Sequence, residues 1–494
     1  MCSVLNGFPF KSPLFNREKG FPVVRIRDLS KGATHTMYSG DVPPEVVVSD
    51  GDLLVGMDGL FRCYEWRGGE AGLNQRVCKI VPNEQFLNRR FLLFGINGYL
   101  RAIEDATSSV TVGHLSSKDI LRIPFPLPPL SEQSRIVAKL EQLLRKVDAC
   151  QKRLANLPVL LKRFRQSVLA AAYSGRLTAD WREDHVGIED AERLIARIGE
   201  SRRDRCEKLR HTRRRMIALG NFDNLEPSLR TDLELPELPR TWRWVDLRFV
   251  MMPEEPFCYG VVQPGEDDRN GPRLVRVCDL DGGQVLASNL RGIPPAVHAE
   301  YARSILTGGE VVVSVVGTIG RSAIVPPWLA GANIARAIAK VPVREFEARF
   351  IALWLSTSRA ETWMVGDARE VARKTLNLEQ LRTLPTPLAP VLEQQEIIRR
   401  VDGLFALASG IEARAAKAQG HIDELTPSML AKAFRGELVA TEAELARREG
   451  RSFEQASILL DRIRVERGSA GQGAAGRSID GGRPSTRRTS RAAR

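Results

Sequence analysis

Three aspartates and six histidines are the side chains of this sequence whose types are suited to binding a metal ion. Asp50, Asp52 and Asp58 surround a short apolar segment. Aspartate is common in the turns that flank a strand, and this explains the three better than a carboxylate metal site does. The histidines are scattered without metal-ligand spacing, at His35, His114, His185, His211, His298 and His421. The sequence therefore predicts no metal site.

Motifs for nucleotide and methyl-transfer chemistry are absent from the sequence. It has no G-x-x-x-x-G-K-[ST] phosphate loop, which argues against a P-loop motor. The glycine-rich stretch 317–320 lacks the strand-to-helix setting of a dinucleotide site. No Asn-Pro-Pro-aromatic tetrapeptide, with which adenine methyltransferases hold the target amine, occurs either. A stand-alone enzyme is therefore disfavoured, and we expect neither catalytic residues nor a bound cofactor in this chain.

The charge balance favours a polyanionic partner. Lys and Arg number 73 against 60 Asp and Glu, a net charge of +13, and the pI is about 9.6. The seven cysteines form no C-x-x-C pair, so we expect reduced thiols and a cytoplasmic protein. No apolar run is long enough for a signal peptide or a membrane span.

A duplicated segment organises the chain. Residues 124–179 and 385–440 align without a gap at a shift of 261, with 17 of 56 positions identical. Each copy begins with a proline-rich approach followed by Glu-Gln, at Glu132-Gln133 and Glu393-Gln394. Proline continues neither a helix nor a strand ladder, so a new element is expected to begin there.

Both copies then carry an apolar heptad seam, which predicts two long helices. The seam residues that we expect to pack between the helices are Ile136, Leu140, Leu143, Val147, Leu154 and Leu161 in the first copy and Ile397, Val401, Leu404, Ile411, Ile422 and Leu425 in the second. Matched seams on one chain favour an antiparallel coiled coil with a pseudo-twofold repeat. The alternative is two separate amphipathic helices, each closing its own domain.

Proline and glycine are expected to interrupt or end these helices. Pro158 and Pro427 predict kinks or restarts, with Thr426 capping the second restart. Gly175 and Gly436 predict the C-terminal ends.

The stretch PLPPLSEQSRIVAKLEQLL with LLKRFRQSVLAAAYSGRLT, echoed by LEQQEIIRRVDGLF and MLAKAFRGELV, resembles the conserved regions of the DNA-specificity subunits of type I restriction-modification systems. The resemblance extends to about Arg467. It implies a non-catalytic subunit that reads a bipartite site in double-stranded DNA. Two methyltransferase subunits using S-adenosylmethionine would dock beside the conserved helices, and two ATP- and Mg-dependent restriction subunits would join them. The assembly would methylate adenines or cleave unmodified DNA.

The expected fold class is α/β, with two mixed α/β target-recognition domains separated by the helices. The predicted regions are 1–123 (first domain), 124–179 (first conserved helical region), 180–237 (helical basic linker), 238–384 (second domain), 385–440 (second conserved helical region), 441–467 (C-terminal helical segment) and 468–494 (disordered basic tail). The second domain opens with a Pro-x-x-Trp segment at Pro239–Trp242 that the first lacks, so the first is expected to be shortened at its N-terminus.

Local patterns predict the elements of the two domains. In the first, strands are expected at 21–29, 52–57 and 74–81 and a helix at 91–100. The second repeats these signals, with Val275–Leu280 matching Val24–Leu29 and Gly331–Asn333 matching Gly72–Asn74.

Candidate DNA contacts follow from the side chains that read bases and phosphates, namely Arg, Asn, Gln, Ser, Thr, Lys and His. Taken singly, such a residue is more often an ordinary surface residue or cap. The candidates in the first domain are Arg25, Arg27, Asn74, Gln75, Arg76, Thr107, Ser108, Ser109, Thr111, His114 and Lys118, and in the second Arg276, Asn333, Arg336, Arg369, Arg373, Lys374 and Asn377.

Helix length predicts a spacing for the two readers. Glu132 to Asn156 is 25 residues, about 37 Å of helix and close to one turn of B-DNA, roughly 34–36 Å. If the helices hold the domains apart, each reads half of a split site with an unread spacer. The competing hypothesis is a DNA-binding scaffold or regulator that self-associates through its helices without a methyltransferase.

Overall fold

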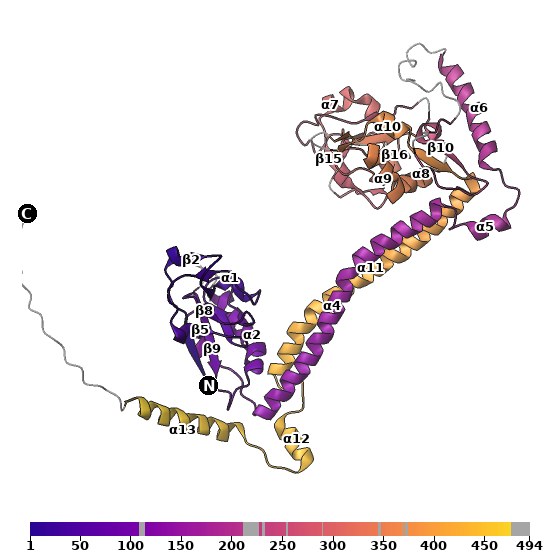
Figure 1. Cartoon of the computed structure of the whole chain (residues 1–494). Coiled ribbons are helices and arrows are strands. Elements are labelled where there is room, and N and C mark those ends of the chain that lie inside the picture. Colours follow the sequence, from indigo (N-terminus) through magenta and orange to yellow (C-terminus); the bar gives the residue numbers. More distant parts are fainter. Residues whose placement is uncertain are drawn as a thin grey trace, which may run out of the picture. The chain divides into compact units, whose positions relative to one another are not determined.

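The structure is a computed structural model that describes residues 1–107, 114–210, 227–229, 233–252, 255–288, 290–343, 347–367, 369–370 and 374–475. The chain divides into two compact units, Met1–Arg153 with Lys417–Arg494, and Leu154–Ala416. Each unit therefore contains one predicted domain and parts of both long helices (Figure 1). The finer predicted boundaries stay predictions.

The helices are α1 (Ile26–Leu29), α2 (Arg89–Thr107), α3 (Ser117–Leu121), α4 (Leu130–Tyr173), α5 (Ala179–Asp184), α6 (Ala191–Arg210), α7 (Pro295–Glu300), α8 (Ala348–Leu355), α9 (Ser358–Asp367), α10 (Leu378–Arg382), α11 (Val391–Phe434), α12 (Glu442–Glu449) and α13 (Ala456–Ala475).

The strands of the first unit are β1 (Cys2–Asn6), β2 (Phe15–Asn16), β3 (Phe21–Val24), β4 (Met37–Tyr38), β5 (Val47–Val48), β6 (Leu53–Gly56), β7 (Cys63–Glu65), β8 (Ala71–Leu73) and β9 (Val77–Pro82). Those of the second are β10 (Arg243–Asp246), β11 (Cys258–Tyr259), β12 (Arg273–Val275), β13 (Leu280–Asp281), β14 (Gln284–Val285), β15 (Arg291–Gly292), β16 (Val311–Ser314), β17 (Ser322–Ile324), β18 (Asn333–Ile334), β19 (Ile338–Val341), β20 (Arg369–Glu370), β21 (Lys374–Thr375) and β22 (Pro385–Leu388).

Each domain is built in layers around one fully buried central strand. In the first, β6 lies in the antiparallel sheet β1-β9-β6-β7, and a second sheet has the order β2-β4-β3-β8-β5. Leu53 and Val55 of β6 pack against α2 and the long helices, whereas Leu54 packs into the core of the second sheet. Strand β16 of the sheet β11-β19-β16-β17 divides its side chains in the same way. Burial on both faces explains why these strands read as continuous apolar runs.

The predictions for local structure were partly right. The strand at 52–57 and the helix at 91–100 are confirmed as β6 and α2. The predicted strand 21–29 was wrong in its second half, because Arg25 starts the helical turn α1, with its backbone N–H donating to the Asp28 carboxylate at 3.0 Å. Arg276 and Asp279 repeat this arrangement in the second domain. The match between the two domains at this turn is therefore confirmed.

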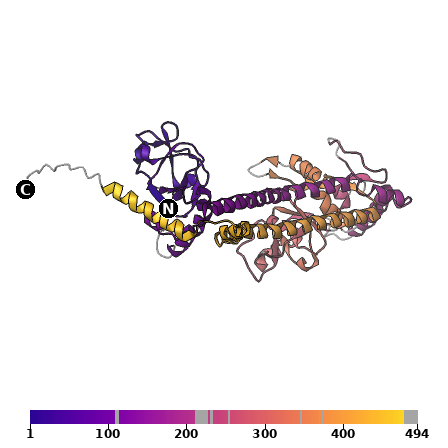
Figure 2. The ribbon, with the colours of Figure 1, turned by 90° about the horizontal axis from the view of Figure 1, so that it is seen from below.

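Helices α4 and α11 are antiparallel partners, as expected (Figures 1 and 2). In the first unit Ile136 and Leu140 share a core with Ala433. In the second unit Arg165 of α4 forms an ion pair with Glu412 of α11 at 2.7 Å. Because the same helix ends also pack against the domains, both readings of the seam are partly right: the helices pair with each other and close the domain cores.

The seam does not hold at every expected position. Ile136, Leu140, Val147, Leu161, Ile397 and Val401 are buried, and Leu143, Leu154, Leu404 and Ile422 are half-buried. Ile411 and Leu425 are 44% and 46% exposed, so their assignment to the seam was wrong. An α-helix drifts by about 20° per heptad from a 3.5-residue repeat. Two and four heptads after Ile397, this drift carries both side chains away from the partner helix.

The predicted restarts at the prolines were wrong, whereas the predicted helix ends were right. Both long helices run through Pro158 and Pro427 without a restart, so Thr426 caps none. Gly175 and Gly436 follow the helix ends with φ of 73° and 76°, the left-handed conformation of a C-terminal signal.

The repeat extends into α6 and α13. Ala191, Leu194 and Ile198 of α6 are buried in the second unit, and Leu459 and Ile463 of α13 are buried in the first. Arg202 of the basic stretch is 1% exposed and donates to the carbonyl of Arg248, so it belongs to the core and not to a solvated face. Arg213–Arg215 lie outside the described residues.

The chain ends of the two domains differ. Helix α13 extends into the predicted tail 468–494 as far as Ala475, and the rest of the tail lies outside the described residues.

A strand pair distinguishes the two domains. Strand β10 pairs with β22 in the second unit. The corresponding residues 124–127 form no strand in the described part of the first unit.

Candidate nucleic-acid interface

The structure brings two of the predicted stretches of the first domain together. The turn 74–76 joins β8 to β9, and His114 follows the loop after α2. Both meet at the end of β6, where Met57 donates its N–H to the carbonyl of Arg76 and accepts the N–H of Leu115. This ladder places Arg76 and His114 side by side although they are far apart in the sequence.

Asp58 holds these two side chains. Its carboxylate lies 3.0 Å from the Arg76 guanidinium and 2.7 Å from Nδ1 of His114. Arg76 and His114 remain 54% and 55% exposed, so each keeps hydrogen-bonding capacity for a partner. Asp58 was interpreted as a turn residue only, and its positioning role was missed. Its place directly after a buried strand was the available signal.

The neighbouring candidates differ in exposure. Gln75 and Lys118 are exposed, whereas Asn74 is half-buried and accepts the N–H of Arg76 at 3.4 Å. Thr107 ends α2. Ser108, Ser109 and Thr111 lie outside the described residues. The exposed candidates around this turn of the first domain are therefore Gln75, Arg76, His114 and Lys118.

The second domain repeats the ladder. Val315, after β16, donates its N–H to the carbonyl of Ala337 and accepts the N–H of Leu376. Arg336 and Lys374 flank this point and are exposed. Arg369 lies in β20, but its side chain is outside the described set, and Arg373 lies outside the described residues.

Asn333 was wrong as a surface candidate. The parallel pairs Val24–Leu73 and Val275–Ile334 show that Asn333 corresponds to Gly72, two residues before Asn74. Asn333 therefore lies within strand β18, whereas Asn74 follows the end of β8 at the start of a turn. Asn333 is fully buried and donates its amide to Ser304 at 2.9 Å. It stabilises the core of the second domain.

Other candidates serve their own domain. Asn377 caps α10 by accepting the N–H of Gln380 at 2.8 Å. Two hydrogen bonds of 3.1 Å join Arg276 to Asp279, and they raise the pKa of Arg276. Arg25 lies over the Phe15 ring at 5.0 Å, and its neighbour Arg27 is largely exposed. Arg25, Arg27 and Arg276 therefore belong to a helical turn of their domain and not to the turns at the ends of β6 and β16.

The duplicated glutamines are functional positions that the sequence reasoning left without a role. Gln133 is fully buried; it donates to the carbonyl of Phe86 and accepts the N–H of Asn88, just before α2. Gln394 is equally buried and accepts the N–H of Glu347, just before α8. Each glutamine thus ties the start of a long helix to the helix of its domain. Their identity in both copies was the signal.

The duplicated glutamates bind the segments that follow the other long helix. Glu132 accepts the N–H of Glu442 at 2.7 Å, at the start of α12. Glu393 is fully buried and accepts from Thr178 at 2.7 Å, Arg182 at 2.8 Å and the Trp242 indole at 2.8 Å. The second anchor is therefore the more extensive one.

Within the part of the chain that the structure describes, no three His, Cys, Asp or Glu side chains are placed to hold a metal ion. Among the same residues, no helix is both long and apolar enough to span a membrane. Free cysteines occur throughout, and burial raises the pKa of Cys78 to about 12, so its thiol is unreactive.

Comparison with known proteins decides the family. Residues 1–158 match the family described as type I restriction modification DNA specificity domain. The specificity subunit of the type I restriction enzyme EcoBI from Escherichia coli is 41% identical over 478 residues, which cover 95% of this chain and 91% of the relative. The chain belongs to the type I restriction enzyme specificity subunits. Their non-catalytic nature agrees with the missing nucleotide and methyl-transfer motifs.

Other specificity subunits are more distant. The EcoDI subunit of Escherichia coli is 26% identical and aligns over 85% of both chains. A chain from the solved structure described as "Structural basis underlying complex assembly and conformational transition of the type I R-M system" matches with a TM-score of 0.56 at 18% identity, covering 88% of this chain and 98% of that one. At this identity the match concerns the fold, two α/β domains with paired central helices.

Proposed function

We propose that this chain reads a bipartite site in double-stranded DNA and directs the methyltransferase and restriction subunits of its enzyme to that site. The observation that carries the proposal is the 41% identity to a type I specificity subunit over 95% of the chain. The two domains support it, because each presents an exposed basic turn at the end of its central buried strand.

The proposed base readers are Arg76 in the first domain and Arg336 in the second. Arginine reads guanine through two hydrogen bonds in the major groove. Asp58 restricts the conformations of Arg76, which lowers the entropy lost on binding. Gln75, His114, Lys118 and Lys374 are proposed as adjoining base or phosphate contacts, together with Arg27 and with Thr107, Ser108, Ser109, Thr111, Arg369 and Arg373.

The paired helices are proposed to set the spacing between the two half-sites. Each long helix has 44 residues, about 66 Å at a rise of roughly 1.5 Å per residue. A continuous helix transmits a fixed spacing better than a flexible linker does. The target is therefore expected to contain two read segments separated by an unread spacer.

Two methyltransferase subunits and two restriction subunits are the proposed partners. Leu407 and Ile411 on α11 are 64% and 44% exposed, and they lie one helical turn apart. Exposed apolar side chains of this kind suit a protein partner. S-adenosylmethionine, ATP and Mg would be bound by the partners, and the complex would act on adenines in the cytoplasm.

Mapping methylated adenines in a host that expresses this chain with its methyltransferase tests the proposal. The wild type should modify adenines in a split motif. R76A should weaken binding by about 1–3 kcal/mol and relax the motif in one half only, and R336A should do so in the other half. R101A and R269A are matched controls, because both are exposed arginines away from the proposed turns.

The competing scaffold hypothesis predicts a different outcome. A chain that only self-associates through its helices would form no complex with the methyltransferase and would leave the methylation pattern unchanged. A continuous motif, or both halves relaxing in R76A, would contradict two independent readers.

A further inference from the structure

The outer face of α4 carries four cations in a regular pattern. Arg145, Lys146, Lys152 and Arg153, which we call the cationic stripe, are all exposed. Residues seven apart on an α-helix differ by only about 20° in direction. Arg145 and Lys146 therefore lie on the same face as Lys152 and Arg153, two turns away. Val147 of the seam is buried, and Arg145 points about 160° away from it. The stripe therefore faces away from the partner helix.

These four side chains have no partner among the residues that the structure describes. In the described part of the chain, none of them forms a hydrogen bond or an ion pair. Asp148 is the one carboxylate among residues 142–156, against these four cations. The stripe therefore contributes no contact to the packing of the helix pair.

The second copy provides an internal comparison. Arg145, Lys146 and Lys152 correspond to Ala406, Leu407 and Ala413 of α11, and only Arg153 retains a cation, Arg414. Seam positions remain apolar in both copies, with Leu143 matched by Leu404 and Val147 by Ala408. Helix pairing therefore does not require the stripe, and another interaction must account for it.

We propose that the cationic stripe binds the phosphate backbone of the unread spacer between the two half-sites. This inference rests on the proposed function. From Arg145 to Arg153 the helix rises about 12 Å, a length over which B-DNA presents about seven phosphates on its two strands. Phosphate contacts position a protein without reading sequence, which is what an unread spacer permits.

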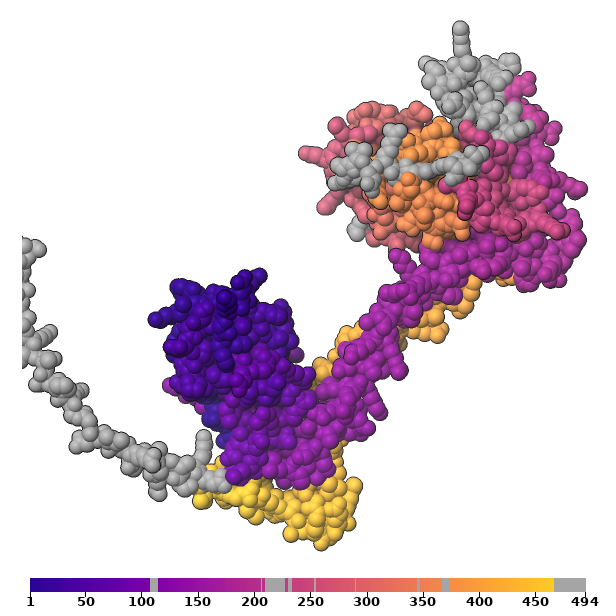
Figure 3. All heavy atoms as spheres, in the orientation of Figure 1, coloured from indigo at the N-terminus to yellow at the C-terminus, as the bar shows by residue number. Residues whose placement is uncertain are grey.

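Charge chemistry favours DNA over a protein as the occupant. The cores of protein interfaces are depleted in lysine, and the stripe offers four cations with only the small Ala149 between the two pairs on this face. Its counterpart on α11 offers Leu407 and Ile411 instead, which suit a protein. Figure 3 shows the middle of α4 with its side chains at the surface.

The salt dependence of binding tests the proposal. The complex with the methyltransferase is titrated with the duplex identified by methylation mapping, for the wild type and for R145Q/K146Q/K152Q/R153Q. Each lost phosphate contact should reduce the slope of log K against log salt by about 0.9, so a reduction of about 2–4 is expected. A control variant with the same charge change, R101Q/R122Q/R447Q/R448Q, should keep the wild-type slope.

A second measurement is made on the wild-type complex, so its main result does not depend on the folding of a variant. Uncharged methylphosphonate linkages confined to the spacer should weaken binding at low salt, and the quadruple variant should be insensitive to them. An unchanged slope, or a wild type that ignores the neutral spacer, overturns the proposal. The proposal is also overturned if the quadruple variant loses the methyltransferase but keeps the wild-type slope of log K against log salt. The stripe would then bind an acidic protein surface. Failure of the wild type to select any sequence would instead refute the proposed function.

Discussion

The two copies of the duplicated segment are most alike where they are buried and least alike on their outer faces. Gln133 and Gln394 are both fully buried and make the same type of contact to the start of a domain helix. On the outside, Arg145 and Lys146 of one copy correspond to Ala406 and Leu407 of the other. The buried anchors meet the same structural requirement twice, so they are equivalent, whereas the outer faces are free to serve different partners.

The glutamate anchors give the largest expected difference between the copies. E393A removes the buried carboxylate that accepts from Arg182 and from the Trp242 indole, which should cost about 3–5 kcal/mol. E132A removes the acceptor of one backbone N–H, that of Glu442, and should cost about 1–3 kcal/mol. Thermal unfolding followed by circular dichroism, with hydrogen exchange at α5 and α12 to localise the loss, measures both effects.

E393Q is the matched control, because it keeps the volume of the side chain and one carbonyl acceptor. It should lie between the wild type and E393A. Equal losses in E393A and E132A would mean that the two anchors are energetically equivalent despite their different partners. The claim that the second glutamate anchor is stronger than the first would then be wrong.

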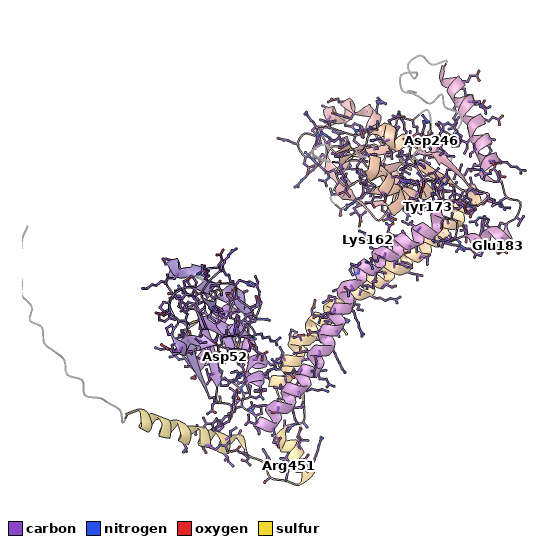
Figure 4. All side chains as sticks on the ribbon, viewed as in Figure 1. Asp52, Lys162, Tyr173, Glu183, Asp246 and Arg451 are labelled. Carbon is purple, nitrogen blue, oxygen red and sulfur yellow. The ribbon has the colours of Figure 1, made fainter. Side chains whose placement is uncertain are left out.

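A charge reversal separates the copies next to these anchors. Arg135 of α4 corresponds to Glu396 of α11. Arg135 pairs with Glu442 of α12 at 2.8 Å, and Arg451, which is labelled in Figure 4, reaches the same carboxylate at 2.7 Å. Burial alone would raise the pKa of Glu442, but hydrogen bonds from Ser131, Arg135 and Arg451 outweigh it and lower the pKa to about 2.

This ion pair predicts an acid-sensitive first unit. A depressed carboxylate pKa stabilises the fold above the unfolded value of about 4.3, and that stability is lost as the pH falls towards 2. E442Q should therefore cost up to about 3 kcal/mol at pH 7 and should flatten the loss of stability between about pH 4.5 and 2. Thermal unfolding across this pH range measures the effect.

E396Q is the comparison in the second unit. The hydrogen bond from Arg399, opposed by burial and joined by that from Arg400, lowers the pKa of Glu396 to about 2. Because Arg399 is 71% exposed, solvent screens this pair and the effect should be smaller than that of E442Q. A steeper acid transition in E442Q than in the wild type would contradict the pairing of Glu442 in solution.

The sequence predicted those features that depend on pattern and repetition. Seventeen identities at one shift revealed the duplication, and the seam revealed the paired helices. It did not predict register, because Asn333 and Asn74 look equivalent until strand pairing matches Asn333 to Gly72, two residues away. It also did not predict that Pro158 and Pro427 stay within helices, since packing along both sides of a long helix outweighs one missing hydrogen bond.

The candidate site was predictable in part for the same reason. Residue types pointed to Arg76, His114, Arg336 and Lys374, and the structure brings these together in pairs at the ends of β6 and β16. Residue types alone do not separate them from Asn377, which caps a helix, or from Arg276, which pairs with Asp279. Distinguishing a cap from a reader requires the position of the backbone around each side chain.

The smallest prediction concerns the outer faces themselves. Gly410 of α11 corresponds to Ala149 of α4, and a methyl group added at Gly410 would meet no atom within 4 Å. Glycine within a helix costs about 1 kcal/mol relative to alanine. G410A should therefore raise the stability of the free chain by up to about 1 kcal/mol, and A149G should lower it by a similar amount, as measured by thermal unfolding.

The substitutions G410A and A149G also show whether the outer face of α11 or that of α4 packs closely against a partner protein. If a methyltransferase helix packs against Gly410, G410A will stabilise the free chain but weaken the complex, because the added methyl group occupies the space needed for close approach. A149G should leave the complex intact, since phosphate contacts through long side chains do not require a bare backbone. A loss of complex in A149G but not in G410A would reverse the roles assigned to the two outer faces.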